Sequence, residues 1–193
     1  MLMNTHMILA NNFLEIADGK KIYLINSKRF IWGNIKPDYV PKYKKIKHYY
    51  NESIDMTINK IKKLSSLSIS DIYYDYGKNK FSEELGVVCH FLCDYFCYPH
   101  YDRWEFKKAL KKHVTYENKL AKVAKTYSPR GYINENISAN NIKNFIEDNL
   151  ELYKLKSGYK NDLEYAHYIC NSIISFILDE IVMNQYYYDE KVI

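Results

Sequence analysis

The sequence predicts an all-α fold in a single compact multi-helix domain, and three observations lead to that prediction. Only six glycines and four prolines occur among the 193 residues, which favours long helices over a loop-rich all-β structure. Inward positions recur at helical spacing, most clearly in a 4-3-4-3-4 stripe formed by Phe106, Leu110, His113, Glu117, Leu120 and Ala124. A chain of this length can bury one sizeable core, so residues 1–193 are expected to form one domain.

The chain is expected to begin with two helices and a loop. Thr5 can cap a helix over residues 6–17, which Asp18-Gly19 would end. A second helix is expected over residues 21–31. Residues 32–41 contain a glycine and two prolines, so they are expected to form an ordered loop that presents Asp38 from a stiff backbone.

The next stretch is basic, PKYKKIKHYY, and a helix carrying His48 is expected from residue 42 to residue 64. The lysines could contact phosphate or a membrane, or they could be the solvated start of a helix, and the second interpretation is preferred. Residues 65–77 are expected to be a linker with a short helix around Ile72.

A buried central helix is expected next, capped by Ser82 and ended at Cys97-Tyr98-Pro99, because proline disfavours helical geometry in the residue before it. His100 would follow in a loop, ahead of a helix over residues 103–125. The remaining segments are a connection over residues 126–138, a helix capped by Ser138 that runs to about residue 156, and a last helix over residues 162–187.

Composition limits the class of protein. The hydrophobic fraction of 47% and the charged fraction of 26% are ordinary for a soluble globular protein. The net charge of +5 permits attraction to anionic lipid or nucleic acid without requiring it. No basic leader precedes an apolar run, and no window reaches the ~18 apolar residues of a membrane span. No signal peptide and no transmembrane segment are therefore expected, and the location is expected to be cytoplasmic.

Three of the four cysteines, Cys89, Cys93 and Cys97, share one face of the central helix, and Cys170 is remote. The C-x3-C-x3-C spacing could suggest an iron–sulfur or zinc site, but the usual ligand spacings differ. The preferred interpretation is that these cysteines are small buried hydrophobic residues.

The residues with the clearest chemistry are spaced H-x3-D-x5-H-x12-H-x3-E. They are His90, Asp94, His100, His113 and Glu117. Two pairs are four residues apart, so on helices each pair stacks on one face. Both pairs lie among apolar positions, where an ionised carboxylate is costly unless it is paired or coordinated. A metal ion is the simplest interpretation.

The wider pattern resembles the bacterial zinc-dependent phospholipase C family, whose catalytic domain shares its fold with the S1/P1-type nucleases. That family has an N-terminal histidine, an aspartate in a loop, a further histidine, then H-x3-D, a histidine, and H-x3-E. The matching residues here, in order, are His6, Asp38, His48, His90, Asp94, His100, His113 and Glu117. The match covers about the first two thirds of the chain and uses five of the six histidines. Only His167 is left, as a surface or core residue.

The resemblance implies up to three zinc sites. One would use Asp38, His48, His90 and Asp94, and a second would use His100, His113 and Glu117. A third would use His6 and share Asp94. In the family this third site is completed by the amino group and carbonyl of an N-terminal tryptophan, whereas this chain starts Met-Leu-Met-Asn. Two zinc ions are therefore expected, and a third is left open. With no C-terminal lipid-binding β-domain in view, a secreted lytic toxin is not expected.

The function that the resemblance favours is hydrolysis of the phosphoester of a phospholipid headgroup. Clustered zinc ions suit this reaction because they lower the pKa of bound water and neutralise charge in the transition state. Asp38 is the candidate catalytic residue, orienting or deprotonating the nucleophile. The partner would be a phospholipid or another phosphodiester, with peripheral membrane contact.

Two alternatives stay open. A nuclease or nucleotidase on the same scaffold would take nucleic acid or nucleotides, although the nuclease branch typically has aspartate where this chain has Glu117. A metal-stabilised helical protein without catalysis is the other.

Overall fold

The computed structural model describes residues 1–17, 19, 21–104 and 106–192. Every regular element among them is helical and no strand occurs in that part of the chain, which confirms the all-α prediction. The elements are α1 (Met3–Ile16), η1 (Ile22–Leu24), α2 (Ser27–Tyr39), α3 (Pro41–Lys44), α4 (Tyr50–Ser65), η2 (Asp71–Asp75), α5 (Lys78–Tyr95), α6 (Tyr98–Tyr101), α7 (Phe106–Ala124), α8 (Ile142–Tyr153) and α9 (Tyr159–Val192).

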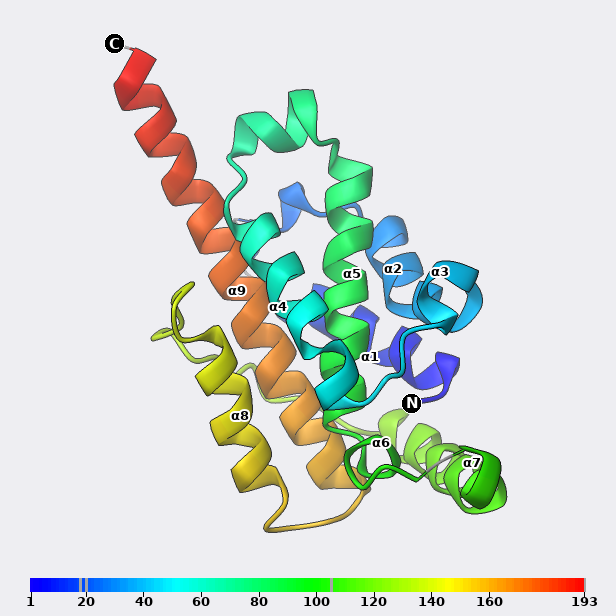
Figure 1. The fold of residues 1–193 in the computed structure, drawn as a ribbon. Helices are drawn as coiled ribbons and strands as arrows, with labels where there is room; N and C mark the ends of the chain where they lie inside the picture. The colour runs from blue at the N-terminus through cyan, green and yellow to red at the C-terminus, as the bar shows by residue number, and fades with distance from the viewer. Residues whose placement is uncertain (18, 20, 105, 193) are drawn as a thin grey trace.

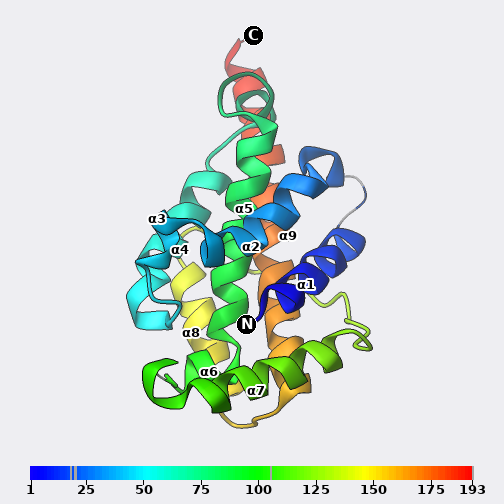
Figure 2. The same ribbon diagram turned by 90° about the vertical axis from the view of Figure 1, so that its right-hand side faces the viewer.

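The central helix α5 is surrounded by the others (Figure 1). The long helix α9 and helix α4 pack along one side of it, and α1 and α2 along another. Figure 2 shows α7 crossing near the lower end of α5, close to the N-terminus. Every side chain from Val87 to Cys97 is buried, so the expectation of a buried central helix is confirmed.

Helix α2 corrects the expected loop at residues 32–41, because it continues through Pro37 to Tyr39. Proline lacks the N–H that would bond to the carbonyl four residues back, but the helix ends only two residues after it. The break comes at Val40, which precedes Pro41 and takes the extended geometry expected there (φ −84°, ψ 127°). Asp38 therefore lies in the last turn of a helix.

Gly33 is not a loop residue but the point where α2 crosses α5. A Cβ atom at Gly33 would lie 2.1 Å from the carbonyl oxygen of Glu83, and one at Gly86 would lie 2.3 Å from that of Phe30. The two backbones touch directly because neither glycine carries a side chain. This contact brings the end of α2 against the half of α5 that carries His90 and Asp94.

Several expected helix boundaries were wrong. Residues 42–64 do not form one helix: α3 ends at Lys44 and α4 begins at Tyr50, so His48 lies in the loop between them. His100 lies in the short helix α6 instead of a loop. Ser82 does not cap α5, which starts four residues earlier; its hydroxyl donates to the Lys78 carbonyl and accepts from the Asn26 N–H.

Smaller shifts affect the other helices. Thr5 is buried inside α1 and caps nothing, residues 21–31 are split between η1 and α2, α8 starts at Ile142, and α9 starts at Tyr159. Helix α7 is kinked at Ala109 (φ −129°, ψ 21°), and Leu110 is 46% exposed, so the predicted inward stripe is continuous only from His113. The expected helix end at Asp18 and the side chain of Phe106 lie outside the described residues.

By length and composition alone, residues 159–187 of α9 could cross a membrane, contrary to the expectation from the sequence. In the structure 67% of the most apolar window of α9 is buried against other helices. A core helix of a folded domain meets the same criteria, and the packing of α9 on α4, α5 and α8 is of that kind.

Candidate metal centre

The eight residues singled out in the sequence come from six segments. Figure 1 shows the elements that carry them converging near the lower end of α5, beside the N-terminus. His90 and Asp94 lie on α5, and His113 and Glu117 lie on α7. The other four are supplied by α1 (His6), the last turn of α2 (Asp38), the loop before α4 (His48) and α6 (His100).

Asp94 is fully buried and lies at the middle of the cluster. Its Oδ2 atom is 2.9 Å from His48 Nδ1 and 3.3 Å from His90 Nε2. Its Oδ1 atom is 3.3 Å from His6 Nε2 and 3.8 Å from His100 Nε2. One carboxylate therefore faces four imidazoles.

Asp38 completes this group from the side of the solvent. Its Oδ1 atom lies 3.8 Å from His90 Nε2 and 3.9 Å from His48 Nδ1. The side chain of Asp38 is 33% exposed, against 0% for Asp94, so Asp38 lies at the mouth of the cluster.

A second group forms around Glu117. Its Oε1 atom is 3.1 Å from His100 Nε2 and 3.0 Å from His113 Nε2. Cys97, interpreted from the sequence as a hydrophobic core residue, is buried as expected, but its sulfur also lies within 4.8 Å of ligand atoms of His100 and Glu117. Burial raises the pKa of the Cys97 thiol well above its usual value, which favours the neutral thiol.

Three sets of ligand atoms lie within 4.8 Å of one another. They are His6 with Asp38 and His90, His48 with His90 and Asp94, and Cys97 with His100 and Glu117. These sets contain seven of the eight residues, and His113 joins them through Glu117, 3.0 Å from its Nε2 atom; His6 is grouped with Asp38 and His90 as well as with Asp94.

The hydrogen bonds of three histidines fix which ring nitrogen faces the cluster. The Nδ1 atoms of His90, His100 and His113 lie 2.7, 3.2 and 3.3 Å from the backbone carbonyl oxygens of Asn34, His48 and Trp104. A carbonyl only accepts, so each Nδ1 carries the proton and donates it there. In the neutral ring, Nε2 is then an acceptor, and all three Nε2 atoms point at carboxylate oxygens, which are acceptors too.

Two acceptors that face each other in a buried site need a cation between them. Metal-binding histidines commonly donate their other ring N–H to a backbone carbonyl or a carboxylate, as these three donate to carbonyls. His6 adds to this picture because both of its ring nitrogens are buried without a hydrogen-bond partner among the described residues. Its ring stacks on His90 with the centroids 4.0 Å apart. These residues fit a divalent metal such as zinc, which binds histidine nitrogen and carboxylate oxygen.

The amino group of Met1 occupies part of this space. It contacts Asp94 Oδ1 and lies 3.1 Å from His100 Nε2 and 3.2 Å from Glu117 Oε1. The resemblance left the third site without its N-terminal partner, whereas here an N-terminal amine lies against Asp94. The Met1 amine was not identified from the sequence, because no local spacing connects it to the motifs. Cys97 was considered as a zinc ligand on the C-x3-C-x3-C spacing and set aside, although it lies three residues from both Asp94 and His100.

The ionisable groups of the cluster strongly shift one another's pKa values. Burial alone would raise the pKa of Asp94, but His100, the Met1 amine and His90 outweigh it and hold the pKa well below its usual value. The pKa of Glu117 is likewise held below its usual value, against the effect of burial, by the Met1 amine and by the imidazoles of His100 and His113 beside its Oε1 atom. Burial, and then His90, lower the pKa of His6 to about 4. The carboxylates therefore stay ionised and His6 stays neutral, which are the forms that bind a metal; Glu117 raises the pKa of His113 against the effect of burial, so metal binding at His113 displaces a proton.

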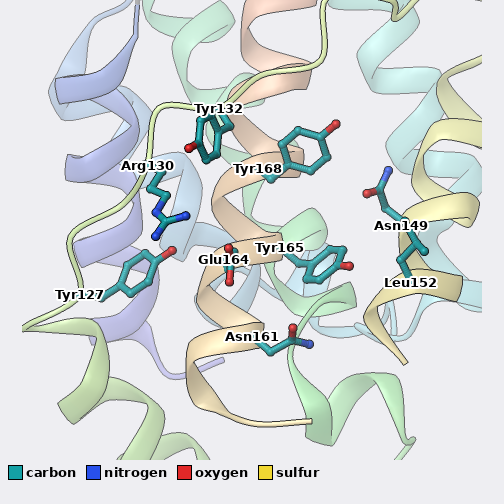
Figure 3. Close-up of a pocket in the computed structure, with 9 residues that line it drawn as sticks. All are labelled: Tyr127, Arg130, Tyr132, Asn149, Leu152, Asn161, Glu164, Tyr165 and Tyr168. Atoms are coloured by element: carbon teal, nitrogen blue, oxygen red, sulfur yellow. The ribbon is translucent and has the colours of Figure 1, made fainter. Parts of the chain in front are cut away.

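The cluster is separate from the hollow shown in Figure 3, which has a volume of about 550 Å³ and lies between α8, α9 and residues 127–132. Tyrosines dominate its lining, which consists of Tyr127, Arg130, Tyr132, Asn149, Leu152, Asn161, Glu164, Tyr165 and Tyr168. None of the eight predicted ligands lines it. Another hollow, of about 560 Å³, does adjoin the cluster, since His100 and Tyr49 line it together with residues of α8.

Comparison with known proteins adds one finding. The family model described as zinc-dependent phospholipase C matches residues 5–160, a range that contains all eight residues of the cluster. No curated protein and no solved structure matches the chain. Because the matched range is well over half of the chain, the resemblance read from the histidine and carboxylate pattern is confirmed, and the protein belongs to the zinc-dependent phospholipase C family.

Proposed function

We propose that this protein hydrolyses the phosphoester of a phospholipid headgroup and that the residues around Asp94 hold the zinc ions it needs. Membership of the family supports the general activity. The observation that carries the location is the set of Nε2 atoms of His90, His100 and His113 that face carboxylate oxygens at 3.0–3.3 Å. A divalent cation between them would satisfy every one of these acceptors.

The proposed ligands form two principal sites and one dependent site. Asp38, His48, His90 and Asp94 would hold one ion, and His100, His113 and Glu117 would hold another. His6 and Asp94 would contribute to a third, next to the Met1 amine. Bound zinc supplies positive charge to phosphoryl oxygens and lowers the pKa of water held beside it.

Asp38 is proposed as the residue that orients the attacking water and accepts its proton. Of the three carboxylates in the cluster it is the most exposed, at 33% against 0% for Asp94 and 7% for Glu117. A general base must reach both water and substrate, and Asp38 is the carboxylate of the three that solvent reaches most readily. Asp94 and Glu117 supply the buried negative charge that favours cations.

The hydrogen bonds from the histidines to backbone carbonyls support separate roles for the histidines, as metal ligands, and for Asp38, as the base. Because Nδ1 of His90, His100 and His113 donates to a carbonyl, each ring keeps one orientation and directs Nε2 into the site. These rings are therefore proposed to bind the metal and not to shuttle protons. The hollow of about 560 Å³ beside His100 offers room for part of a substrate next to the cluster.

The test is zinc content measured together with turnover. The purified protein should contain about two zinc ions per chain and hydrolyse a chromogenic phosphodiester that carries a lipid headgroup; a chelator should abolish turnover and added zinc should restore it. Asp38→Asn should keep zinc at the Glu117 group and lower turnover by on the order of 10²–10⁴-fold. Zinc-loaded protein that hydrolyses none of several headgroup esters contradicts the proposal.

Two further measurements separate the alternatives. Single-stranded DNA that is cut faster than the lipid analogue would favour a nuclease. A large loss of stability on chelation, without hydrolysis of any phosphoester, would favour a non-catalytic metal-stabilised protein.

A further inference from the structure

Two segments of the chain hold a disproportionate share of its positive charge. Residues 41–48 and 106–125 together contain eleven lysines and one acidic residue, Glu117, whose carboxylate points into the metal cluster. The chain as a whole has 28 basic and 23 acidic residues, so the rest of it is net acidic. The net positive charge of the protein therefore comes from these two segments.

The fold puts both segments beside the mouth of the cluster. The first contains α3 and ends at His48, and the second is α7 with His113 and Glu117. Figure 1 shows α3 and α7 on the same side of the molecule, on either side of the N-terminus, and Figure 2 faces that side. A flat charged surface that approached Asp38 would meet both segments.

The lysines of these segments are free to meet such a surface. Lys42, Lys45, Lys47 and Lys111 are exposed, and none of them forms an ion pair with another described residue. Some lysines outside these segments pair with acids, as Lys36 does with Glu83 and Lys60 with Glu84. Unpaired lysines carry their full charge to a partner.

Apolar groups accompany the lysines. Leu110 is 46% exposed in the first turns of α7, directly before Lys111, and Tyr39 is 52% exposed beside Asp38. Lys112 lies over the ring of Trp104, 3.7 Å from its centroid. Lysines interspersed with a leucine and aromatic rings are typical of surfaces that rest on the headgroup region of a bilayer.

We propose that Lys42, Lys45, Lys47, Lys111 and Leu110, here called the lysine face, dock the protein on an anionic phospholipid bilayer with the mouth of the cluster against the lipid headgroups. The orientation rests on the proposed function, since only a lipid substrate gives it a purpose; the docking itself depends only on charge. Attraction of this kind is short-ranged, falling off within about 10 Å at 0.1 M salt. Each lysine near an anionic surface is expected to raise binding about fivefold.

Sedimentation with vesicles tests the docking. The protein should bind vesicles that contain phosphatidylserine, bind pure phosphatidylcholine vesicles far more weakly, and be released by high salt. The triple variant Lys42→Gln, Lys45→Gln, Lys47→Gln should bind anionic vesicles about 100-fold more weakly. A matched control, Lys28→Gln, Lys62→Gln, Lys156→Gln, removes the same charge from exposed positions outside the two segments and should bind nearly as the unaltered chain does.

The outcomes separate docking from catalysis. Hydrolysis of a soluble headgroup ester should be unchanged in the triple variant, because none of its three lysines belongs to the metal cluster. Equal binding to both kinds of vesicle, equal losses in the triple and control variants, or tighter binding to single-stranded DNA than to anionic vesicles would overturn the proposal. Vesicle binding without any hydrolysis would leave the docking standing and would overturn the proposed function.

Discussion

Asp94 and Asp162 are both fully buried, and the fold surrounds them in opposite ways. Among the described residues, Asp162 accepts hydrogen bonds from neutral donors alone: the Tyr153 hydroxyl at 2.7 Å, the Tyr116 hydroxyl at 2.9 Å and the Tyr98 N–H at 3.2 Å. Asp94 is met by imidazole nitrogens and an ammonium group. Burial raises the pKa of Asp162 to about 6, although its hydrogen bonds oppose the shift. At Asp94 burial acts in the same direction, but His100, the Met1 amine and His90 outweigh it and hold the pKa well below its usual value.

The difference separates a structural acid from a candidate ligand. A carboxylate that already has three donors needs nothing further, and Asp162 joins α6, α7, α8 and α9 through one side chain. A carboxylate surrounded by ring nitrogens is stable only with positive charge beside it. Burial alone therefore does not identify a metal site; the identity of the neighbouring atoms does.

The largest expected effect is on Asp94. Asp94→Asn removes the charge that four imidazoles face, so the variant should lose the zinc ion held with Asp38, His48 and His90, and about 3–5 kcal/mol of unfolding free energy. Metal analysis and denaturant unfolding of the two proteins measure both losses. Zinc content equal to that of the unaltered chain would mean that the cluster around Asp94 is not the metal site.

A smaller effect is expected at Asp162, where substitution should give a relative gain in stability as the pH rises. Because its pKa is raised on folding, its protonation stabilises the fold fully below about pH 4, and that contribution is lost as the pH rises through about 6. The loss amounts to about 3 kcal/mol. Asn at this position can donate to the Tyr153 hydroxyl and accept from the other two donors, so Asp162→Asn should remove this pH dependence.

The measurement for Asp162 is the difference in unfolding free energy between the variant and the unaltered chain at pH 4 and at pH 7. The variant should gain relative stability as the pH rises, with its zinc content unchanged. A relative stability that is the same at both pH values would show that the carboxyl is not perturbed.

A substitution where α2 crosses α5, away from the ligands themselves, should weaken the metal site around Asp94. Gly86→Ala should push α2 away from α5, cost about 1–3 kcal/mol of stability, and move the Asn34 carbonyl away from His90 Nδ1. Loss of such a supporting hydrogen bond typically lowers metal affinity 10–100-fold. Zinc competition with a chelating dye measures this. Gly77→Ala is the control: Gly77 has no close neighbour and a positive φ, so stability should fall while zinc affinity is kept.

The smallest effect is expected at Cys97, the side chain placed near Glu117 that was not predicted as a ligand. Cys97→Ala should cost about 1 kcal/mol, as for a typical core substitution, and leave zinc content unchanged if the ligands are the eight residues named above. Loss of one zinc ion per chain would show that the thiol is a ligand and correct the second site.

The sequence predicted the all-α class and the eight residues of the cluster because their information is local or follows a family order. The two His-x3-carboxylate pairs lie one turn apart on α5 and α7, as expected. The supporting carbonyls of Asn34, His48 and Trp104 could not be predicted, because a carbonyl is present at every residue and only tertiary packing selects one.

Other features that were not predicted from the sequence also depend on tertiary packing. The Met1 amine reaches the cluster through packing alone, whereas Cys97 lies three residues from Asp94 and from His100 and was set aside because its spacing to the other cysteines is unusual for a metal site. Pro37 was taken as a helix breaker, but contact with α5 outweighs the local preference. The tyrosines around Asp162 come from three separate segments, so nothing in the sequence indicated that this acid would be surrounded by hydroxyl groups.

The contact between Gly33 and Gly86 has a consequence for how the protein can vary. With main chain against main chain, no side chain remains there whose exchange could compensate for a small displacement. The distance between Asp38 on α2 and Asp94 on α5 is therefore set by how the two backbones pack. Redesign of the opening will succeed by changing what α3 and α7 present, not by repacking the junction between α2 and α5.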